Sequence, residues 1–210
     1  EIENFAADVA HEIKNPLTSL RSAVETAARV TDPEQQRRLM SIIQEDVTRM
    51  DRLISDISNA SRLDAELARA DLTPVDMGRL LDTLVQLQKS KSGDDAPDLT
   101  IDPIDPGRCV VNGIDGRLVQ VFQNLVGNAL SFSPPGGHVH LAAMLKNGEI
   151  LITVEDSGPG IPDESLDSVF ERFYTQRPES EAFGTHSGLG LSISRQIIEA
   201  HDGSIIAANR

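Results

Sequence analysis

His11 and Glu12 are the residues of this chain best suited to nucleophilic chemistry. A carboxylate such as that of Glu12 can accept a proton from one imidazole nitrogen, which makes the other nitrogen more nucleophilic. His11 follows Val9 by two positions, roughly 200° around a helix, so we expect its ring to point away from the apolar face. Pro16 removes the amide that would bond the Glu12 carbonyl and so loosens the helix beside His11. The alternative is an idle surface histidine, because adjacent His and Glu residues are common by chance.

A second constellation places two amides on one predicted helix. Asn124 and Asn128 are four residues apart in a helical pattern that follows Asp115. Side chains at this spacing project from the same face, where their oxygens could hold a hard cation together with its phosphates. The simpler interpretation is a pair of amides that face solvent or bond the helix.

Two glycine-bearing segments could hold the rest of a nucleotide. Asp156 ends an apolar strand and precedes Gly158 and Gly160, so its carboxylate could accept an exocyclic amine of a flat ring that the backbone approaches closely. Gly188 and Gly190 open an amphipathic helix, whose free amides and positive dipole end attract an anion. Each segment alone is also typical of an ordinary turn or helix start. The polar stretch between them, residues 174–185, has the composition of a mobile lid.

The order of these features along one chain indicates that a nucleotide phosphorylates the histidine. A formal net charge of −14 argues against nucleic acid or anionic lipid as a partner, so a small anionic nucleotide would need local donors or a metal.

Cys109 is the only cysteine, which excludes a disulfide framework and fits a reducing compartment. The sequence has no apolar run of about 18 residues and no leader pattern, so we expect neither a membrane span nor a signal peptide within it.

A predicted helical hairpin positions the histidine. Apolar residues recur every three or four positions from Phe5 to about Val30, and again from Leu39 to Ile57. Between them, the stretch Thr31-Asp32-Pro33-Glu34 supplies a capping side chain and a proline at the first helical position. The two apolar stripes are too long to bury against each other alone, so we expect a homodimer that completes a four-helix bundle.

From residue 71 onward the pattern predicts a mixed set of strands and helices. We expect strands at 71–77, near Leu99, at 108–112 and at 204–208, a β-hairpin of 138–146 and 149–155, and helices at 78–90, 116–131 and 188–201. The fold class is therefore α+β, with the helical hairpin followed by a mixed α/β domain.

Five short segments resemble the sequence boxes of two-component sensor histidine kinases. The H box is matched by F-A-A-D-V-A-H-E-I-K-N-P-L, the N box by N-L-V-G-N-A, the F box by F-E-R-F-Y, and the two glycine boxes by D-S-G-P-G and S-G-L-G-L-S. The resemblance covers essentially the whole chain, and the first box is also similar to alphaproteobacterial kinases of acid and envelope sensing. It implies a dimerisation and phosphotransfer hairpin at 1–67, followed at 71–210 by an ATP-binding α/β sandwich of the type shared with gyrase, Hsp90 and MutL.

The resemblance implies a role for each matched residue. His11 would attack the γ-phosphate of ATP with Glu12 as its base, and Asn15 would orient water for dephosphorylating the partner. Asn128 would ligate Mg²⁺, and Asp156 would read the adenine amine. The other nucleotide contacts would come from Asn124, Gly158, Gly160, Gly188, Leu189 and Gly190. The phosphoryl acceptor would be an aspartate of a response-regulator receiver domain, and the chain would be the cytoplasmic part of a longer inner-membrane sensor.

Departures from the family pattern leave rival functions open. Ser131 stands where many members carry lysine, and Thr175 where the F box often continues with arginine, so two cations expected near the phosphates are missing. We therefore hypothesise weak or lid-dependent autophosphorylation, with Arg177 as a substitute cation. The alternatives are a phosphatase-dominant, nucleotide-binding dimeric scaffold, and another ATPase of the superfamily, which would lack the histidine hairpin.

His138 and His140 share a strand face without a third ligand, which argues against a metal site there.

Overall fold

The computed structural model describes residues 2–67, 69–91, 93, 95–105, 107–174 and 188–209, with only the backbone of residues 2–8, 64 and 65. The chain divides into two compact units, which we describe separately. The first holds the described parts of 1–64 and 171–190, and the second holds those of 65–170 and 191–210. In this described portion, no helix combines the length and the apolar character that crossing a membrane requires.

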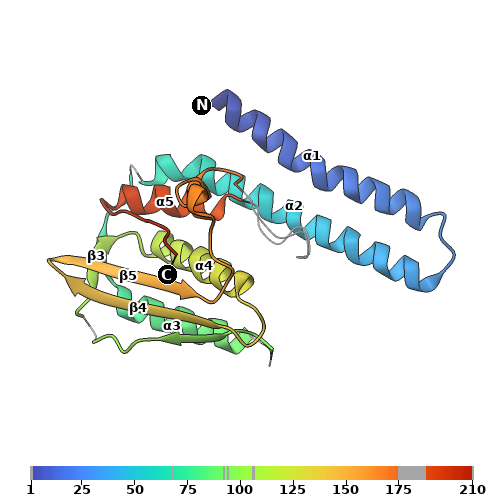
Figure 1. Ribbon diagram of the computed structural model, residues 1–210. Helices are drawn as coiled ribbons and strands as arrows, with labels where there is room; N and C mark the ends of the chain where they lie inside the picture. The colour runs from blue at the N-terminus through green and yellow to red at the C-terminus, as the bar shows by residue number, and fades with distance from the viewer. Residues whose placement is uncertain are drawn as a thin grey trace. The chain divides into compact units, whose positions relative to one another are not determined.

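The first unit is built on a helical hairpin (Figure 1). Helix α1 spans Ile2–Ala27, and helix α2 spans Pro33–Leu67. As predicted, Pro33 is the first residue of α2, and the carboxylate of Asp32 accepts the N–H of Glu34 at 3.1 Å. Helix α1 continues through Pro16, which is fully buried. The predicted helical N-terminal region is therefore confirmed.

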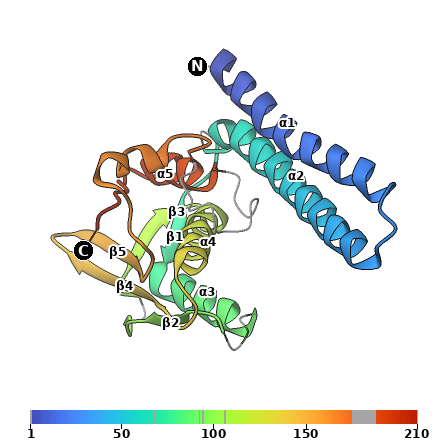
Figure 2. The same cartoon turned by 45° about the vertical axis from the view of Figure 1, so that its right-hand side comes forward.

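The second unit contains two sheets and three further helices among its described residues. Its elements in chain order are β1 (Thr73–Asp76), α3 (Met77–Lys91), β2 (Asp98–Ile101), β3 (Val110–Gly113), α4 (Asp115–Phe132), β4 (His138–Lys146), β5 (Glu149–Asp156) and α5 (Gly190–Ala200), with short 3₁₀ turns at Asp163–Ser165 and Ser168–Phe170. Strands β1 and β3 pair antiparallel (Figure 2). The other sheet has the order β2-β4-β5, with β2 parallel and β5 antiparallel to β4.

Helices α3 and α4 pack against the β2-β4-β5 sheet, and the core lies between these layers. Strand β4 alternates as expected for one buried face, because Val139 and Leu141 are fully buried while His138 is exposed. The helix layer contributes a matching apolar set, namely Leu81, Leu84, Val85, Leu118, Val121, Phe122 and Val126. The predicted α+β class, with a helical region followed by an α/β sandwich, is confirmed.

One predicted strand is wrong. Residues 203–209 have no regular secondary structure, although the sequence pattern predicted a strand at 204–208. A strand requires a neighbouring backbone that accepts its ladder of hydrogen bonds. Here the segment is anchored by a side chain instead, since the Asn209 amide donates to the Ile161 carbonyl at 2.6 Å and accepts its N–H at 2.9 Å. Helix α5 also begins two residues later than predicted, because Gly188 has a φ of +71°, outside the helical region.

Candidate active site

His11 lies exposed on α1, as its place on the helical wheel predicts, and Asn15 is exposed one turn further along the same helix. Glu12 is turned toward α2, where its Oε2 lies 3.4 Å from Nη2 of Arg49. These two side chains are only 26% and 17% exposed, so the ion pair is partly shielded from water. The hairpin therefore presents an imidazole to solvent beside a carboxylate that a cation of the other helix holds.

Arg49 is a candidate functional residue that sequence reasoning missed. Its Nε is buried without a hydrogen-bond partner in the described part of the chain, and so is Oδ2 of Asp46 one turn earlier. No sequence signal identifies Arg49. It precedes Leu53 by four residues, and only the structure shows that Leu53 is fully buried and that Arg49 lies on the inward face of α2.

Asn124 and Asn128 are half-buried on α4, where their spacing places them on one face. The Nδ2 of Asn124 donates to Oγ of Ser194 on α5 at 3.4 Å, and Ser194 is completely buried. The side-chain nitrogen of Asn124 is therefore used in a hydrogen bond within the protein. Neutral amide oxygens suit Mg²⁺, a hard ion that retains several waters and the phosphate oxygens of its nucleotide. The donor set on α4 thus fits a Mg²⁺ held mainly by its nucleotide.

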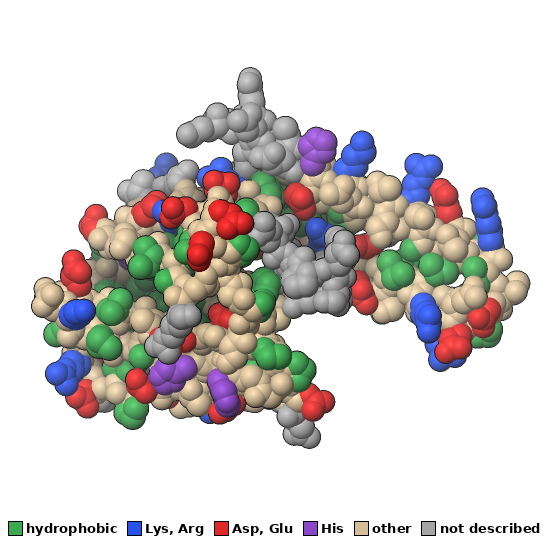
Figure 3. All heavy atoms as spheres, viewed as in Figure 1, with side chains coloured by type: hydrophobic (Ala, Val, Ile, Leu, Met, Phe, Trp, Pro, Cys, Tyr) green, Lys and Arg blue, Asp and Glu red, His purple; other side chains and the backbone are tan. Residues whose placement is uncertain are grey.

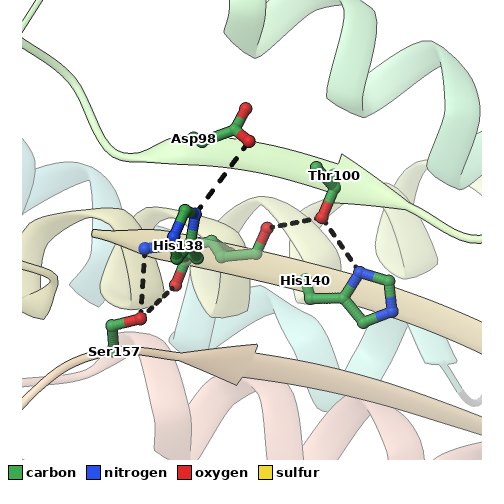
Figure 4. Close-up of polar contacts among 6 residues, drawn as sticks. Asp98, Thr100, His138, His140 and Ser157 are labelled. Carbon is green, nitrogen blue, oxygen red and sulfur yellow. Dashed lines mark hydrogen bonds and ion pairs between the residues drawn. The ribbon is translucent and has the colours of Figure 1, made fainter. Parts of the chain in front are cut away.

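Asp156 is fixed in a tight turn at the end of β5. Its Oδ1 accepts the N–H of Gly158 at 2.8 Å. Oγ of Ser157 accepts the N–H of His138 and donates to the carbonyl of the same residue, both at 3.1 Å, which joins the turn to β4 (Figure 4). A Cβ at position 158 would lie 2.6 Å from Oδ1 of Asp156 and 3.1 Å from the carbonyl oxygen of Phe132, so only glycine fits. The exposed carboxylate is therefore a rigidly held acceptor.

The second glycine segment leads into α5. Gly188 adopts a φ of +71°, and its carbonyl accepts the N–H of Phe173 at 2.9 Å. Leu189 is fully buried, and Gly190 is the first residue of α5. Gly160, in the first glycine segment, also has a positive φ, of 78°. Outside the described residues lie Thr175, Arg177 and most of the predicted lid at 174–185.

The histidines of β4 lie beside polar side chains of β2 and of the residue that follows it; Figure 4 draws the contacts with Asp98 and Thr100. Nδ1 of His140 lies 2.9 Å from Oγ1 of Thr100, and its Nε2 lies 3.4 Å from a carboxylate oxygen of Asp102. His138 approaches Asp98 at 4.0 Å. Across the described part of the chain, no group of three or more His, Cys, Asp or Glu side chains could hold a metal ion.

Two known domain families match the chain. Residues 1–66 match HisKA, the His Kinase A (phospho-acceptor) domain, and residues 113–210 match HATPase_c, the Histidine kinase-, DNA gyrase B-, and HSP90-like ATPase. Sensor protein ChvG of Rhizobium meliloti (strain 1021) is 53% identical over 214 residues, which cover 99% of this chain and 37% of that protein. The chain thus spans little more than a third of the length of the curated relatives it matches first.

Solved structures of histidine kinases share the fold. The histidine kinase ThkA in complex with response regulator protein TrrA gives a TM-score of 0.76 at 26% identity, covering 99% of this chain and 57% of that one. The mycobacterial sensor histidine kinase MprB gives a TM-score of 0.53 at 31% identity, covering 64% of this chain and 83% of that one. Together, the two domain matches and these relatives show that the chain belongs to the sensor histidine kinases, as the core that carries their phospho-acceptor and ATPase domains.

Proposed function

We propose that this core phosphorylates itself on His11 with Mg-ATP and then passes the phosphoryl group to an aspartate of a response-regulator receiver domain. The observation that supports this most directly is the exposure of His11 next to the Glu12–Arg49 pair. An exposed imidazole can reach a bound nucleotide, and the oriented carboxylate can take its proton. The histidine kinase ThkA is solved with a response regulator, which supports a receiver domain as the partner.

In the proposed phosphoryl transfer, one bond to the γ-phosphorus forms and another breaks. One imidazole nitrogen of His11 attacks the γ-phosphorus, and a P–N bond forms as the bond to the β,γ-bridging oxygen breaks. ADP leaves with that oxygen and its electron pair, while Glu12 accepts the proton from the other ring nitrogen. The Asn128 oxygen would help to hold Mg²⁺, which, when bound, would neutralise negative charge on the nucleotide.

The other matched residues hold the nucleotide. The Asp156 carboxylate accepts a hydrogen bond from the adenine amine, and Gly158 and Gly160 allow the backbone to approach the ring. Asn124 lies beside the phosphates. The segment Gly188, Leu189 and Gly190 places the amides at the start of α5 toward phosphate oxygens.

Asn15 is our candidate for a reverse, regulator-phosphatase activity. It follows His11 by four residues on α1 and is exposed like it, so a receiver domain docked over His11 also meets the Asn15 amide. An amide there can orient a water molecule toward the phosphoaspartate. Substitution of Asn15 by alanine should therefore slow dephosphorylation of the regulator while leaving phosphorylation of His11 in place.

We further propose that the domains meet between residues 67 and 71, and that the hairpin forms a homodimer. Figure 3 shows apolar side chains at the surface of the hairpin. Those exposed by 45% or more are Leu17, Val24, Met40, Val47 and Ile54. Burying such a set stabilises a four-helix bundle by the hydrophobic effect.

Because the relatives are sensor proteins of which this chain spans only part, we propose that it is the cytoplasmic part of a membrane-bound sensor.

The test is transfer of label from γ-labelled ATP with Mg²⁺. We expect an acid-labile, alkali-stable label on the wild-type chain and none on His11→Ala. His138→Ala is the matched control, since His138 is also exposed but lies on a strand of the second unit. A label that persists in His11→Ala would overturn the proposal. ATP binding without any label would favour the phosphatase-dominant scaffold that Ser131 and Thr175 suggest, and hydrolysis without phosphohistidine would favour another ATPase of the superfamily.

A further inference from the structure

His201, just after the end of α5, joins two distant parts of the second unit. Its Nε2 accepts the backbone N–H of Ile114 at 3.0 Å, across 87 positions of sequence. Its Nδ1 lies 2.7 Å from the carbonyl oxygen of Ile197, one turn earlier in α5. Both ring nitrogens are therefore occupied by backbone groups of the protein.

The Ile114 amide is a group that needs such a partner. Ile114 is the N-cap residue of α4, has an extended backbone, and has no side-chain cap. The first amides of a helix find no acceptor within the helix, and burying one without a partner is costly. Gly113 makes the contact possible, because a Cβ there would lie 2.9 Å from Cδ2 and 3.1 Å from Nε2 of His201.

A second bond joins the same two helices further along. The Asn124 amide of α4 donates to Ser194 of α5, so the helices are tied near their middles as well as where α4 starts and α5 ends. Helix α4 carries the amide pair Asn124 and Asn128, and α5 follows directly on the second glycine segment. The spacing of these two phosphate-facing elements thus depends on both ties.

We propose that His201 is a positioning residue for nucleotide binding, which fixes the start of α4 to the end of α5. The inference rests on the proposed role of α4 and of the glycine segment in holding ATP. His201 itself touches only backbone groups in the bonds described above, and it acts by keeping Asn124 and Asn128 at a fixed distance from α5.

The two hydrogen bonds also define which nitrogen of the His201 ring carries the proton. An amide N–H can only donate, so Nε2 must be the unprotonated nitrogen, and Nδ1 must carry the proton that the Ile197 carbonyl accepts. The assignment follows from the partners and can be checked directly. These two partners require the Nδ1–H tautomer of the His201 ring.

Two substitutions in the complete chain test the proposal. His201→Phe keeps a ring but removes the acceptor, and we expect the Kd for ATP to rise about tenfold, the effect of one lost hydrogen bond. His201→Gln offers a side-chain oxygen in place of Nε2 and should restore most of the affinity. Labelling of His11 at saturating ATP should return to the wild-type rate in both variants, so the change falls on KM rather than on kcat. His138→Phe is the control, an exposed histidine outside this contact.

The possible outcomes separate this inference from the proposed function. Wild-type affinity in His201→Phe, or a His201→Gln variant as weak as His201→Phe, would overturn the positioning role. If His201→Phe does not fold, long-range ¹H–¹⁵N correlations of the wild-type ring decide instead, and an Nε2–H tautomer would overturn it. A chain whose ATP affinity depends on His201 but which never labels His11 would support the positioning role and contradict the kinase proposal.

Discussion

Arg49 of α2 holds Glu12 of α1 through an Nη2 to Oε2 contact of 3.4 Å, across 37 positions of sequence. The residue pair His11 and Glu12 is therefore completed by a third group from the second helix. The guanidinium of Arg49 fixes the direction of the Glu12 carboxylate, the group proposed to accept the proton of His11. In the proposed reaction, the fold of the hairpin, and not only the local sequence, therefore orients the carboxylate that serves His11.

Arg49→Gln should lower the rate of His11 labelling by on the order of tenfold, because the Glu12 carboxylate loses the cation that orients it. The measurement is the initial rate of phosphohistidine formation at saturating ATP. Arg21→Gln is the matched control, since Arg21 pairs with Glu25 on the exposed surface of α1 at 3.0 Å. Equal rates for Arg49→Gln and the wild type would show that the pair has no catalytic role.

Asp156→Asn should weaken ATP binding by about ten- to a hundredfold, the effect of losing a hydrogen bond to a charged acceptor. The asparagine oxygen can still accept the N–H of Gly158, so the turn is kept, but its NH₂ then faces the adenine amine, donor against donor. Calorimetric titration with ATP measures the change, and Glu164→Gln is the control, because Glu164 is an exposed acid outside the Asp156 turn. Unchanged affinity would remove Asp156 from the adenine site.

Ile54→Glu should convert the proposed homodimer to a monomer. Ile54 is 55% exposed and lines an open apolar groove on the hairpin with Val9, Ile13 and Ile57, so a carboxylate there would be buried unpaired in a four-helix bundle. Sedimentation equilibrium gives the mass of each variant. Ile206→Glu provides the comparison, because Ile206 is 84% exposed in the C-terminal segment and should not affect dimerisation. A dimer that survives Ile54→Glu would exclude this face as the interface.

Asp76 should make the second unit less stable in acid. The N–H of Gly107, at 2.9 Å, and that of Arg79, at 3.3 Å, hold the pKa of its carboxyl below the ordinary value. Because the folded state favours the charged form, this stabilisation is complete above the ordinary pKa and is lost as the pH falls through the lowered one. Asp76→Asn should therefore lower the free energy of unfolding at neutral pH, and lower it less in acid.

Urea titrations at neutral and at acidic pH measure this difference. The exposed Asp51 of α2, changed to asparagine, supplies the baseline for loss of a carboxylate. If the cost of Asp76→Asn is the same at both pH values, the lowered pKa does not contribute to stability.

Local patterns predicted most elements of the fold. The hairpin of β4 and β5 was placed almost residue for residue, because Asn147 and Gly148 turn with φ values of 54° and 86° between two alternating strands. The start of α2 was placed by Asp32 and Pro33 for a similar local reason. The strand expected at 204–208 failed because an apolar alternation shows that a segment can pair, and pairing depends on a partner elsewhere in the chain.

The candidate site was likewise predicted only in part. Motif spacing identified His11, Asn128 and Asp156, whose proposed roles depend on short sequence boxes. Arg49 and His201 were not assigned a role, because each acts through one contact with a residue far away in the sequence. Such contacts become visible only when the helices and strands are placed in space.

The contact between Ile114 and His201 can form only late in the synthesis of the protein. The helical hairpin consists of neighbouring segments and can form as soon as they leave the ribosome. The amide at the start of α4 receives its acceptor only when residue 201 has been made, 87 positions later. During translation, the phospho-acceptor helices therefore precede the completed ATPase domain, and the growing chain presents its histidine before it can hold the nucleotide in place.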